Sequence, residues 1–237
     1  MTKNSIALGR YAAQQQVAVS TLQAQFDQGL ATSATIVAPV QEYTLDNRRF
    51  LGVLAFPPPP AIEKIQLLQA ALQAADSRQF YIPGHGLHIT IKNIRTIADP
   101  PKFSSQDVIN ASALLSTVVP NHSRIAMLGQ GLLITPSSVS IPLFTTAGYG
   151  DLVTDLNHNL NKIGLPDDKA YSSQTVFFTN ITIVRYTTKP NESFFQQLTA
   201  GNTIGIAPFV VDSVSLVTSN LAFSTRHYQN FVSYRFQ

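Results

Sequence analysis

The stretch Leu87-His88-Ile89-Thr90-Ile91 has a near-copy in Thr179-Asn180-Ile181-Thr182-Ile183, about ninety residues further along the chain. Both stretches alternate polar and apolar side chains in runs rich in β-branched residues, which is typical of half-buried β-strands. Side chains two positions apart on a strand share a face. The sequence therefore predicts two strands, each with a polar pair on one face and isoleucines directed into a core.

The two polar pairs predict one site built from two related halves. His88 and Thr90 form the first pair, and Asn180 and Thr182 form the second. We expect these four side chains to line one cleft, with the two threonine hydroxyls close enough to bind one ligand. Only the first pair contains a histidine. What this asymmetry means for the site is therefore the main functional question.

Composition excludes several classes of function. The 237 residues are 44% hydrophobic and 12% charged, which indicates a folded protein. The formal net charge is +3 without any run of Lys or Arg, so we expect no binding of duplex DNA. With no cysteine, disulfides and thiolate chemistry are excluded. The sequence shows neither a signal peptide nor a membrane-spanning run, so we expect a soluble, cytoplasmic monomer that binds no membrane.

Helices are predicted where apolar residues recur every three or four positions. The predicted helices cover residues 11–28, 61–75, 104–119, 149–163 and 192–199. In the first of them, the expected apolar face consists of Ala18, Leu22, Phe26 and Leu30. Besides the strand that carries His88, strands are predicted at residues 49–56, 124–134, 138–144, 176–186, 209–219 and 228–236.

The order of these elements predicts an α+β fold in which hairpins outnumber β-α-β crossovers. The second half repeats the helix–strand order of the first, so we expect two intertwined lobes around a shared cleft. Residues 1–45 are interpreted as an N-terminal extension, made of a helix and an extended segment. Residues 46–237 form the main domain.

Three features resemble the 2H phosphoesterase superfamily, also described as LigT-like or RNA 2′,5′-ligase-like. They are His88-Ile89-Thr90-Ile91, Ile181-Thr182-Ile183 in the other half, and the late alternating segment Val211-Asp212-Ser213-Val214-Ser215-Leu216. The resemblance covers residues 48–236. It implies two pseudo-symmetric antiparallel sheets, flanked by helices, around a central groove across which two His-x-Thr/Ser motifs face each other.

The resemblance also implies a chemistry. Proteins of this family act on 2′,3′-cyclic or 2′,5′-linked nucleotide phosphates at RNA ends, without a metal or another cofactor. Matched position by position, His88 is one acid/base group, and Thr90 and Thr182 are phosphate ligands. Imidazole titrates near neutrality and can accept or donate the proton, while hydroxyls can donate to the non-bridging oxygens.

The sequence departs from this family pattern at Asn180, where the second histidine is expected. A carboxamide forms hydrogen bonds but does not transfer protons near neutral pH. Losing one positioned acid/base group costs about 10²- to 10⁴-fold in rate. Three functions therefore stay open: a phosphodiesterase with a non-standard partner for His88, a nucleotide- or RNA-end-binding module, and a scaffold that kept only the fold.

Other residues are candidates for supporting roles. His85 and His227 are candidates for the second proton-transfer group, with a turn residue as the alternative for His85. Arg95 and Arg185 each follow a motif by a few residues and are candidates for holding a phosphate, with a cation at a strand end as the alternative. Aromatic residues that could stack on a base, or simply fill a core, are Tyr81, Phe144, Phe178, Tyr186 and Tyr228.

Overall fold

Two antiparallel sheets form the body of the molecule, and each takes strands from both halves of the chain. The computed structural model describes residues 9–30 and 34–237. Its helices are α1 (Gly9–Asp27), α2 (Pro59–Ala75), α3 (Ser105–Val118), α4 (Ala147–Lys162) and α5 (Glu192–Gly201), with short 3₁₀ turns at Gly84–Gly86 and Val119–Asn121. Its strands are β1 (Arg49–Ala55), β2 (Phe80–Tyr81), β3 (Ile89–Ala98), β4 (Ile125–Gln130), β5 (Leu133–Ile134), β6 (Ser138–Thr145), β7 (Thr179–Arg185), β8 (Gly205–Val211), β9 (Ser213–Ser219) and β10 (Gln229–Arg235).

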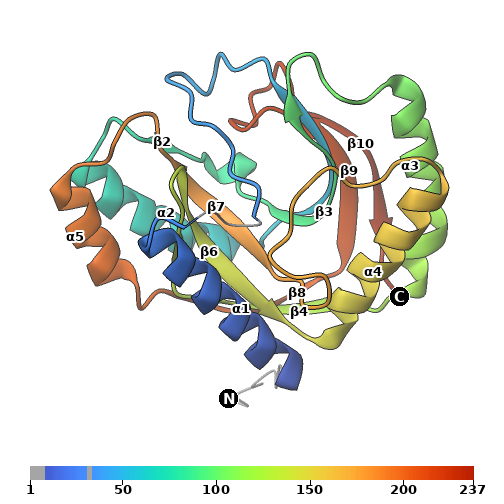
Figure 1. The fold of residues 1–237 in the computed structure, drawn as a ribbon, viewed down its shortest axis with the longest axis horizontal. Helices are drawn as coiled ribbons and strands as arrows, with labels where there is room; N and C mark the ends of the chain where they lie inside the picture. The colour runs from blue at the N-terminus through green and yellow to red at the C-terminus, as the bar shows by residue number, and fades with distance from the viewer. Residues whose placement is uncertain (1–8, 31–33) are drawn as a thin grey trace.

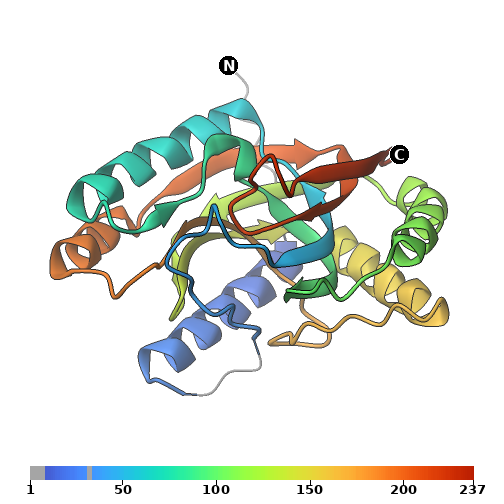
Figure 2. The ribbon, with the colours of Figure 1, turned by 90° about the horizontal axis from the view of Figure 1, so that it is seen from above.

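One sheet has four strands in the order β10-β9-β1-β3. The other has six strands, in the order β2-β7-β6-β4-β8 with β5 paired to β6. We call them the β3 sheet and the β7 sheet, after the strands that carry the two polar pairs. In Figures 1 and 2, α3 and α4 lie on the outer side of the β3 sheet, and α2 lies against the β7 sheet with α5 packed beside α2. The predicted α+β fold of two sheets flanked by helices is confirmed.

The buried faces of the two sheets belong to one hydrophobic core. Ile89 and Ile91 on β3 and Ile181 and Ile183 on β7 are all at most 2% exposed and lie in the same cluster of apolar side chains. The predicted alternation of buried isoleucines and polar residues is therefore confirmed in both strands. Since a single core supports both sheets, their inner faces are fixed relative to each other.

Local signals determine where the helices begin. At α3, the Ser104 hydroxyl accepts a hydrogen bond from the backbone N–H of Asp107, whose carboxylate in turn accepts one from the N–H of Ser104. This capping box stabilises the first turn. At α5, the Asn191 side chain accepts from the backbone N–H of Phe194. At α2, proline occupies the first turn, where its missing N–H needs no partner.

Two of the predicted strands are divided in the structure. The predicted strand 124–134 ends at Gln130, and the chain turns at Gly131 (φ 73°) before β5 begins. The predicted strand 209–219 breaks at Asp212, with β8 in the β7 sheet and β9 in the β3 sheet. A β-prone sequence specifies an extended backbone but does not specify which sheet it joins.

The N-terminal helix packs on the face of the β7 sheet that also carries the polar pair Asn180 and Thr182. Helix α1 contacts β5 and β6, and its buried residues are Ala12, Gln15, Val19 and Leu22. Leu22 and Phe26 of the predicted apolar face pack in one apolar cluster, whereas Leu30 lies beyond the end of α1 and is 53% exposed. Gln15 is a buried polar residue of this face: its Nε2 donates to the Thr145 hydroxyl and to the Phe177 carbonyl, and its Oε1 accepts from the Thr145 N–H.

After α1, an irregular segment (residues 34–48) leads to β1 (Figure 2). Tyr43 anchors it: this side chain is 1% exposed, and its hydroxyl donates to the Tyr186 carbonyl at 3.1 Å. Asn220, between β9 and β10, donates to the carbonyls of Tyr43 and Asp46. The predicted extension of residues 1–45 thus includes α1 and most of this segment, whereas residues 1–8 and 31–33 lie outside the described residues. The boundary at residue 46 stays a prediction.

No helix in the described part of the chain is long and apolar enough to cross a membrane.

We expect Gln15→Ala to lower the free energy of unfolding by about 1 to 3 kcal/mol, because it leaves the Thr145 N–H without its side-chain acceptor and leaves the Phe177 carbonyl with the Tyr11 hydroxyl as its remaining side-chain donor. Urea unfolding followed by circular dichroism measures the change. Gln16→Ala is the matched control, since Gln16 is exposed on the same turn and should change the unfolding free energy by at most about 0.5 kcal/mol. Equal unfolding free energies for the two variants would contradict a docking role for Gln15.

Candidate functional site

A groove between the two sheets contains the predicted polar pairs. It encloses a cavity of about 390 Å³, and His88, Thr90, Asn180 and Thr182 all line it. The strands that carry them meet directly, because the Thr179 hydroxyl donates to the Thr90 carbonyl at 2.8 Å. The expectation of one cleft lined by both pairs therefore agrees with where the structure places these residues.

The expected alternation of side chains along β3 is interrupted by a bulge at Ile91. Val53 pairs with Lys92 and Leu54 pairs with Thr90, so Ile91 is an extra residue between two paired positions. Such a bulge shifts the alternation by one. Ile91 consequently lines the cavity beside Thr90 although it is buried, and Asn93, the partner of Gly52, also faces the groove.

His88 is held in one orientation by the backbone carbonyl of Gly86 and by an aromatic neighbour. It lies between the 3₁₀ turn Gly84–Gly86 and the first residue of β3. Its Nδ1 lies 2.8 Å from the Gly86 carbonyl, which only accepts hydrogen bonds, so Nδ1 carries the proton. Nε2 is then left with a lone pair that can accept a proton or a hydrogen bond. This is the tautomer that a general base requires.

Phe223 forms the wall behind the His88 imidazole. The two rings have centroids 4.4 Å apart, tilted by 33°. Phe223 is in the left-handed backbone region (φ 52°), which costs a residue with a side chain about 1–2 kcal/mol. Asn220 closes this turn by accepting a hydrogen bond from the Ser224 N–H. The strained turn thus places an aromatic ring against the histidine.

Burial makes the imidazole of His88 difficult to charge. Its pKa is lowered to about 4: desolvation is the main cause, the hydrogen bond to Gly86 acts in the opposite direction, and the nearby cations Arg185 and Lys169 add to the lowering. His88 is therefore neutral at pH 7. A neutral imidazole can take a proton from water or from a ribose hydroxyl, but it cannot supply one.

The second polar pair forms a small hydrogen-bond network. The Ser140 hydroxyl donates to the Thr182 hydroxyl at 3.2 Å, and Nδ2 of Asn180 lies 3.5 Å from the same oxygen. Because Thr182 accepts from Ser140, its own hydroxyl proton is available to a ligand in the groove. The Asn180 carboxamide is therefore in contact with Thr182.

Two cations in the groove have no acidic partner among the described residues. Lys169, in the loop between α4 and β7, and Arg185, at the end of β7, both line the cavity, and neither forms an ion pair. The buried Nε of Arg185 also lacks a hydrogen-bond partner within this part of the chain. Burial lowers the pKa of Lys169 and lowers that of Arg185 to about 10, so the guanidinium stays charged at neutral pH.

The neighbouring cations are neutralised. Arg48 lines the same cavity but forms a bidentate pair with Asp46. The buried Lys92 pairs with Asp167. The contrast indicates that the positive charge of Lys169 and Arg185 is available to an anion, whereas the other charges near the groove serve the fold.

Several predicted site residues lie away from the groove. Arg95 pairs with Leu51 across β1 and β3, which directs its side chain to the opposite face, where it donates to the carbonyls of Ile94 and Pro166. His227 is in the β9–β10 loop and does not line the cavity. Tyr228 packs on Phe223 and lines a separate surface pocket together with His85. Of the four predicted binding residues, only Arg185 lines the groove.

The predicted stacking residues divide in the same way. Tyr81 donates to the Asp76 carbonyl, Phe144 is buried under α1, and Tyr186 is buried in the main core. Phe178, directly before β7, lines the groove.

Sequence reasoning missed Lys169, Phe223, Ser138 and Ser140. The two serines are detectable from the polar–apolar alternation in Ser138-Val139-Ser140-Ile141, which was used only to predict a strand. Lys169 and Phe223 lie in loops and have no periodic signal. Within residues 9–30 and 34–237, no group of three or more His, Asp or Glu side chains is placed to hold a metal ion.

Comparison with known proteins identifies the fold. No family model matches the chain, and no curated protein matches its sequence. Among solved structures, TT0787 of Thermus thermophilus matches with a TM-score of 0.57 and 15% identity, over 79% of this chain and 97% of that one. E. coli LigT complexed with 3′-AMP matches with a TM-score of 0.53 and 14% identity, over 81% and 99%. The chain has a LigT-like fold.

A third structure, described as a phosphoesterase, matches with a TM-score of 0.51 and 15% identity, over 81% of this chain and 99% of that one. At identities this low, the matches establish the LigT-like fold alone. The chemistry must be inferred from the residues in the groove.

We expect the His88 imidazole to titrate with a midpoint near pH 4 in this LigT-like fold. The unfolded chain takes up this proton near pH 6.5, so the wild type should lose stability relative to His88→Gln as the pH falls from about 6.5 to about 4. NMR of the imidazole Cε1–H signal, assigned by its absence in His88→Gln, measures the midpoint. A midpoint at or above 6 would contradict the buried, neutral imidazole.

Proposed function

We propose that this chain is a 2H phosphoesterase-like protein that binds nucleotide phosphates, of the 2′,3′-cyclic or 2′,5′-linked kind found at RNA ends, in the groove between its sheets. The observation that carries the proposal is the pair Lys169 and Arg185. Both are cations without acidic partners among the described residues, and they line the same cavity as His88 and the two threonines, Thr90 and Thr182. Keeping unpaired cations in a groove is costly unless an anion completes the site.

Each residue has a distinct part in this proposal. Lys169 and Arg185 neutralise the phosphate, and Thr90 and Thr182 donate to its non-bridging oxygens. His88 accepts a hydrogen bond from the attacking water or from a ribose hydroxyl. Structures of E. coli LigT complexed with 3′-AMP and with ATP support this choice of ligand class, because that protein shares the fold.

The same geometry argues that turnover is impaired. In hydrolysis of a cyclic phosphate, a base removes a proton from water as the water oxygen attacks phosphorus, and an acid protonates the ribose oxygen as its bond to phosphorus breaks. Neutral His88 can serve as the base. Asn180 cannot serve as the acid, because a carboxamide does not donate its protons in such a step. Binding with slow or no cleavage is therefore the function that this groove supports best.

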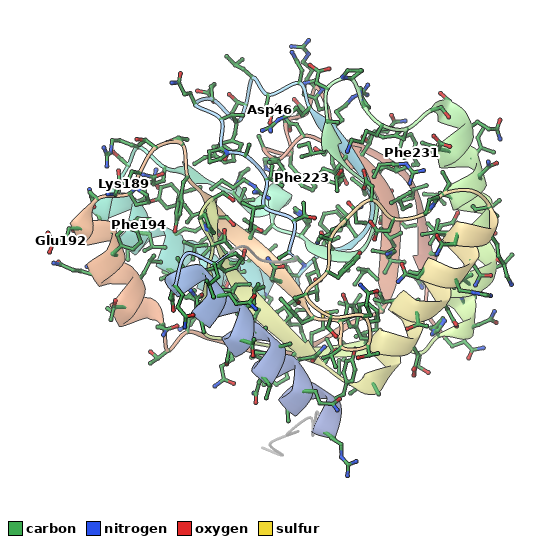
Figure 3. All side chains as sticks on the ribbon, in the orientation of Figure 1. Asp46, Lys189, Glu192, Phe194, Phe223 and Phe231 are labelled. Carbon is green, nitrogen blue, oxygen red and sulfur yellow. The ribbon has the colours of Figure 1, made fainter. Side chains whose placement is uncertain are left out.

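Lys169→Met should weaken binding of 2′,3′-cyclic AMP and of inorganic phosphate by about 10- to 100-fold, since a charged hydrogen bond to the phosphate is lost while the length of the side chain is kept. Isothermal titration calorimetry gives both affinities. Lys189→Met is the control: Lys189 is exposed and lies beside α5, at the edge of the molecule far from Phe223 in Figure 3. Equal affinities for the wild type and both variants would refute the phosphate site.

Asn180→His should create or raise hydrolysis of 2′,3′-cyclic AMP, by up to about 10²- to 10⁴-fold, because it restores a second proton-transfer group opposite His88. Chromatographic assay of the products over pH 5–9 should give a bell-shaped profile for the variant. Asn180→Gln, which adds no titrating group, and the double variant Asn180→His with His88→Gln are the controls and should stay inactive. A fast wild type that the substitution slows would show that another residue already supplies the second proton.

A further inference from the structure

The groove has an apolar end in addition to its cationic end. The N-terminal extension supplies one side of it through Leu22 and Phe26 of α1 and Ala34 of the following segment. The β7 sheet supplies the other side through Leu133 and Phe178. All five line the same cavity as the polar pairs. Phe26, Ala34 and Phe178 also pack against one apolar cluster that is separate from the main core.

The register of the β7 sheet makes the two ends continuous. Leu133 on β5 pairs with Ser140 on β6, and Ser140 pairs with Thr182 on β7. Directly paired residues of antiparallel strands share a face. One row across the sheet therefore runs from an apolar side chain to the hydroxyl proposed to bind phosphate. A ligand lying along this row meets an apolar surface at one end and donors at the other.

The wall formed by the extension is hydrogen-bonded to the loop between α4 and β7, which carries Lys169, as well as to the β7 sheet. The Thr35 hydroxyl accepts a hydrogen bond from the backbone N–H of Ala170, the residue after Lys169, at 2.8 Å. Gln15 fixes α1 to β6, and Tyr43 fixes the start of the path into β1. The extension is thus a built wall of the groove.

We infer that the N-terminal extension forms a subsite for the base of a nucleoside 2′,3′-cyclic phosphate, with Phe26 and Phe178 as its aromatic surfaces. The inference rests on the proposed function and adds to it the part of the ligand that is not phosphate. An aromatic side chain in an apolar pocket binds a base by stacking. A cavity of about 390 Å³ is in the range of pockets that bury one small ligand.

This chain is longer than the LigT structure that it matches. The match covers 81% of this chain and 99% of LigT complexed with 3′-AMP, so about a fifth of this chain lies outside the match.

The experiment compares affinities for 2′,3′-cyclic AMP and inorganic phosphate by calorimetry in the wild type, Phe26→Leu and Phe178→Leu. Leucine keeps apolar packing and removes the planar ring, and thermal unfolding checks that both variants fold. We expect each variant to bind 2′,3′-cyclic AMP about 10-fold more weakly than the wild type does, and to bind inorganic phosphate as tightly as the wild type. Phe195→Leu, on α5 and 42% exposed, is the control and should change neither affinity.

The outcomes separate this inference from the proposed function. The base subsite alone is overturned if Phe26→Leu and Phe178→Leu bind both ligands as tightly as the wild type. It is also overturned if the two variants lose affinity for both ligands equally. Failure of the wild type to bind either ligand overturns the proposed function as well. A short oligoribonucleotide ending in a 2′,3′-cyclic phosphate identifies the source of the ligand. If the oligoribonucleotide binds as tightly as 2′,3′-cyclic AMP, the result supports an RNA end in the subsite. If it binds much more weakly, the result supports a free nucleotide there.

Discussion

The hydrogen bond from the Thr179 hydroxyl to the Thr90 carbonyl joins the two sheets at the point where the polar pairs meet. The core beneath this contact is shared, since the buried isoleucines of β3 and β7 belong to one cluster. As a result, neither sheet can turn its polar face away from the other without breaking that core. The site therefore depends on how the sheets pack, and each sheet supplies only half of it.

Charge pairing gives the groove its chemical character. The cations that support the fold near the groove are neutralised by carboxylates: Arg48 by Asp46, and Lys92 by Asp167. Lys169 and Arg185 are the exceptions among the described residues that line the cavity. Burial of the site and the charge of these two cations also keep His88 neutral, with a pKa lowered to about 4. In the proposed function, this arrangement favours binding of an anion over efficient turnover, because His88 can accept a proton and the Asn180 carboxamide does not transfer one.

The extension explains why a chain with a LigT-like fold has a groove with unequal ends. Helix α1 occupies the same sheet face as the polar pairs, and its position is determined by the buried amide of Gln15. The polar part of the face stays open to a ligand, while the apolar part is shared between α1 and the groove. A segment that resembles an addition to the domain in the sequence is therefore part of the wall of the groove in three dimensions.

Strand periodicity, a local property, determined much that was predictable here. The alternation in both motifs identified the buried isoleucines and the four polar residues facing the groove, and the helical periodicity of apolar residues placed most helices. The sequence also carries the serines of β6, although their role became visible only beside Thr182. Tertiary structure alone decided the rest. The split at Asp212 depends on which sheet each strand joins, and the outward direction of Arg95 depends on its pairing with Leu51. Lys169 and Phe223 reach the site from loops, whose paths follow from packing between segments distant in the sequence. Periodicity describes neighbours along the chain, whereas a site made from two sheets and their loops is set by contacts that no local pattern encodes.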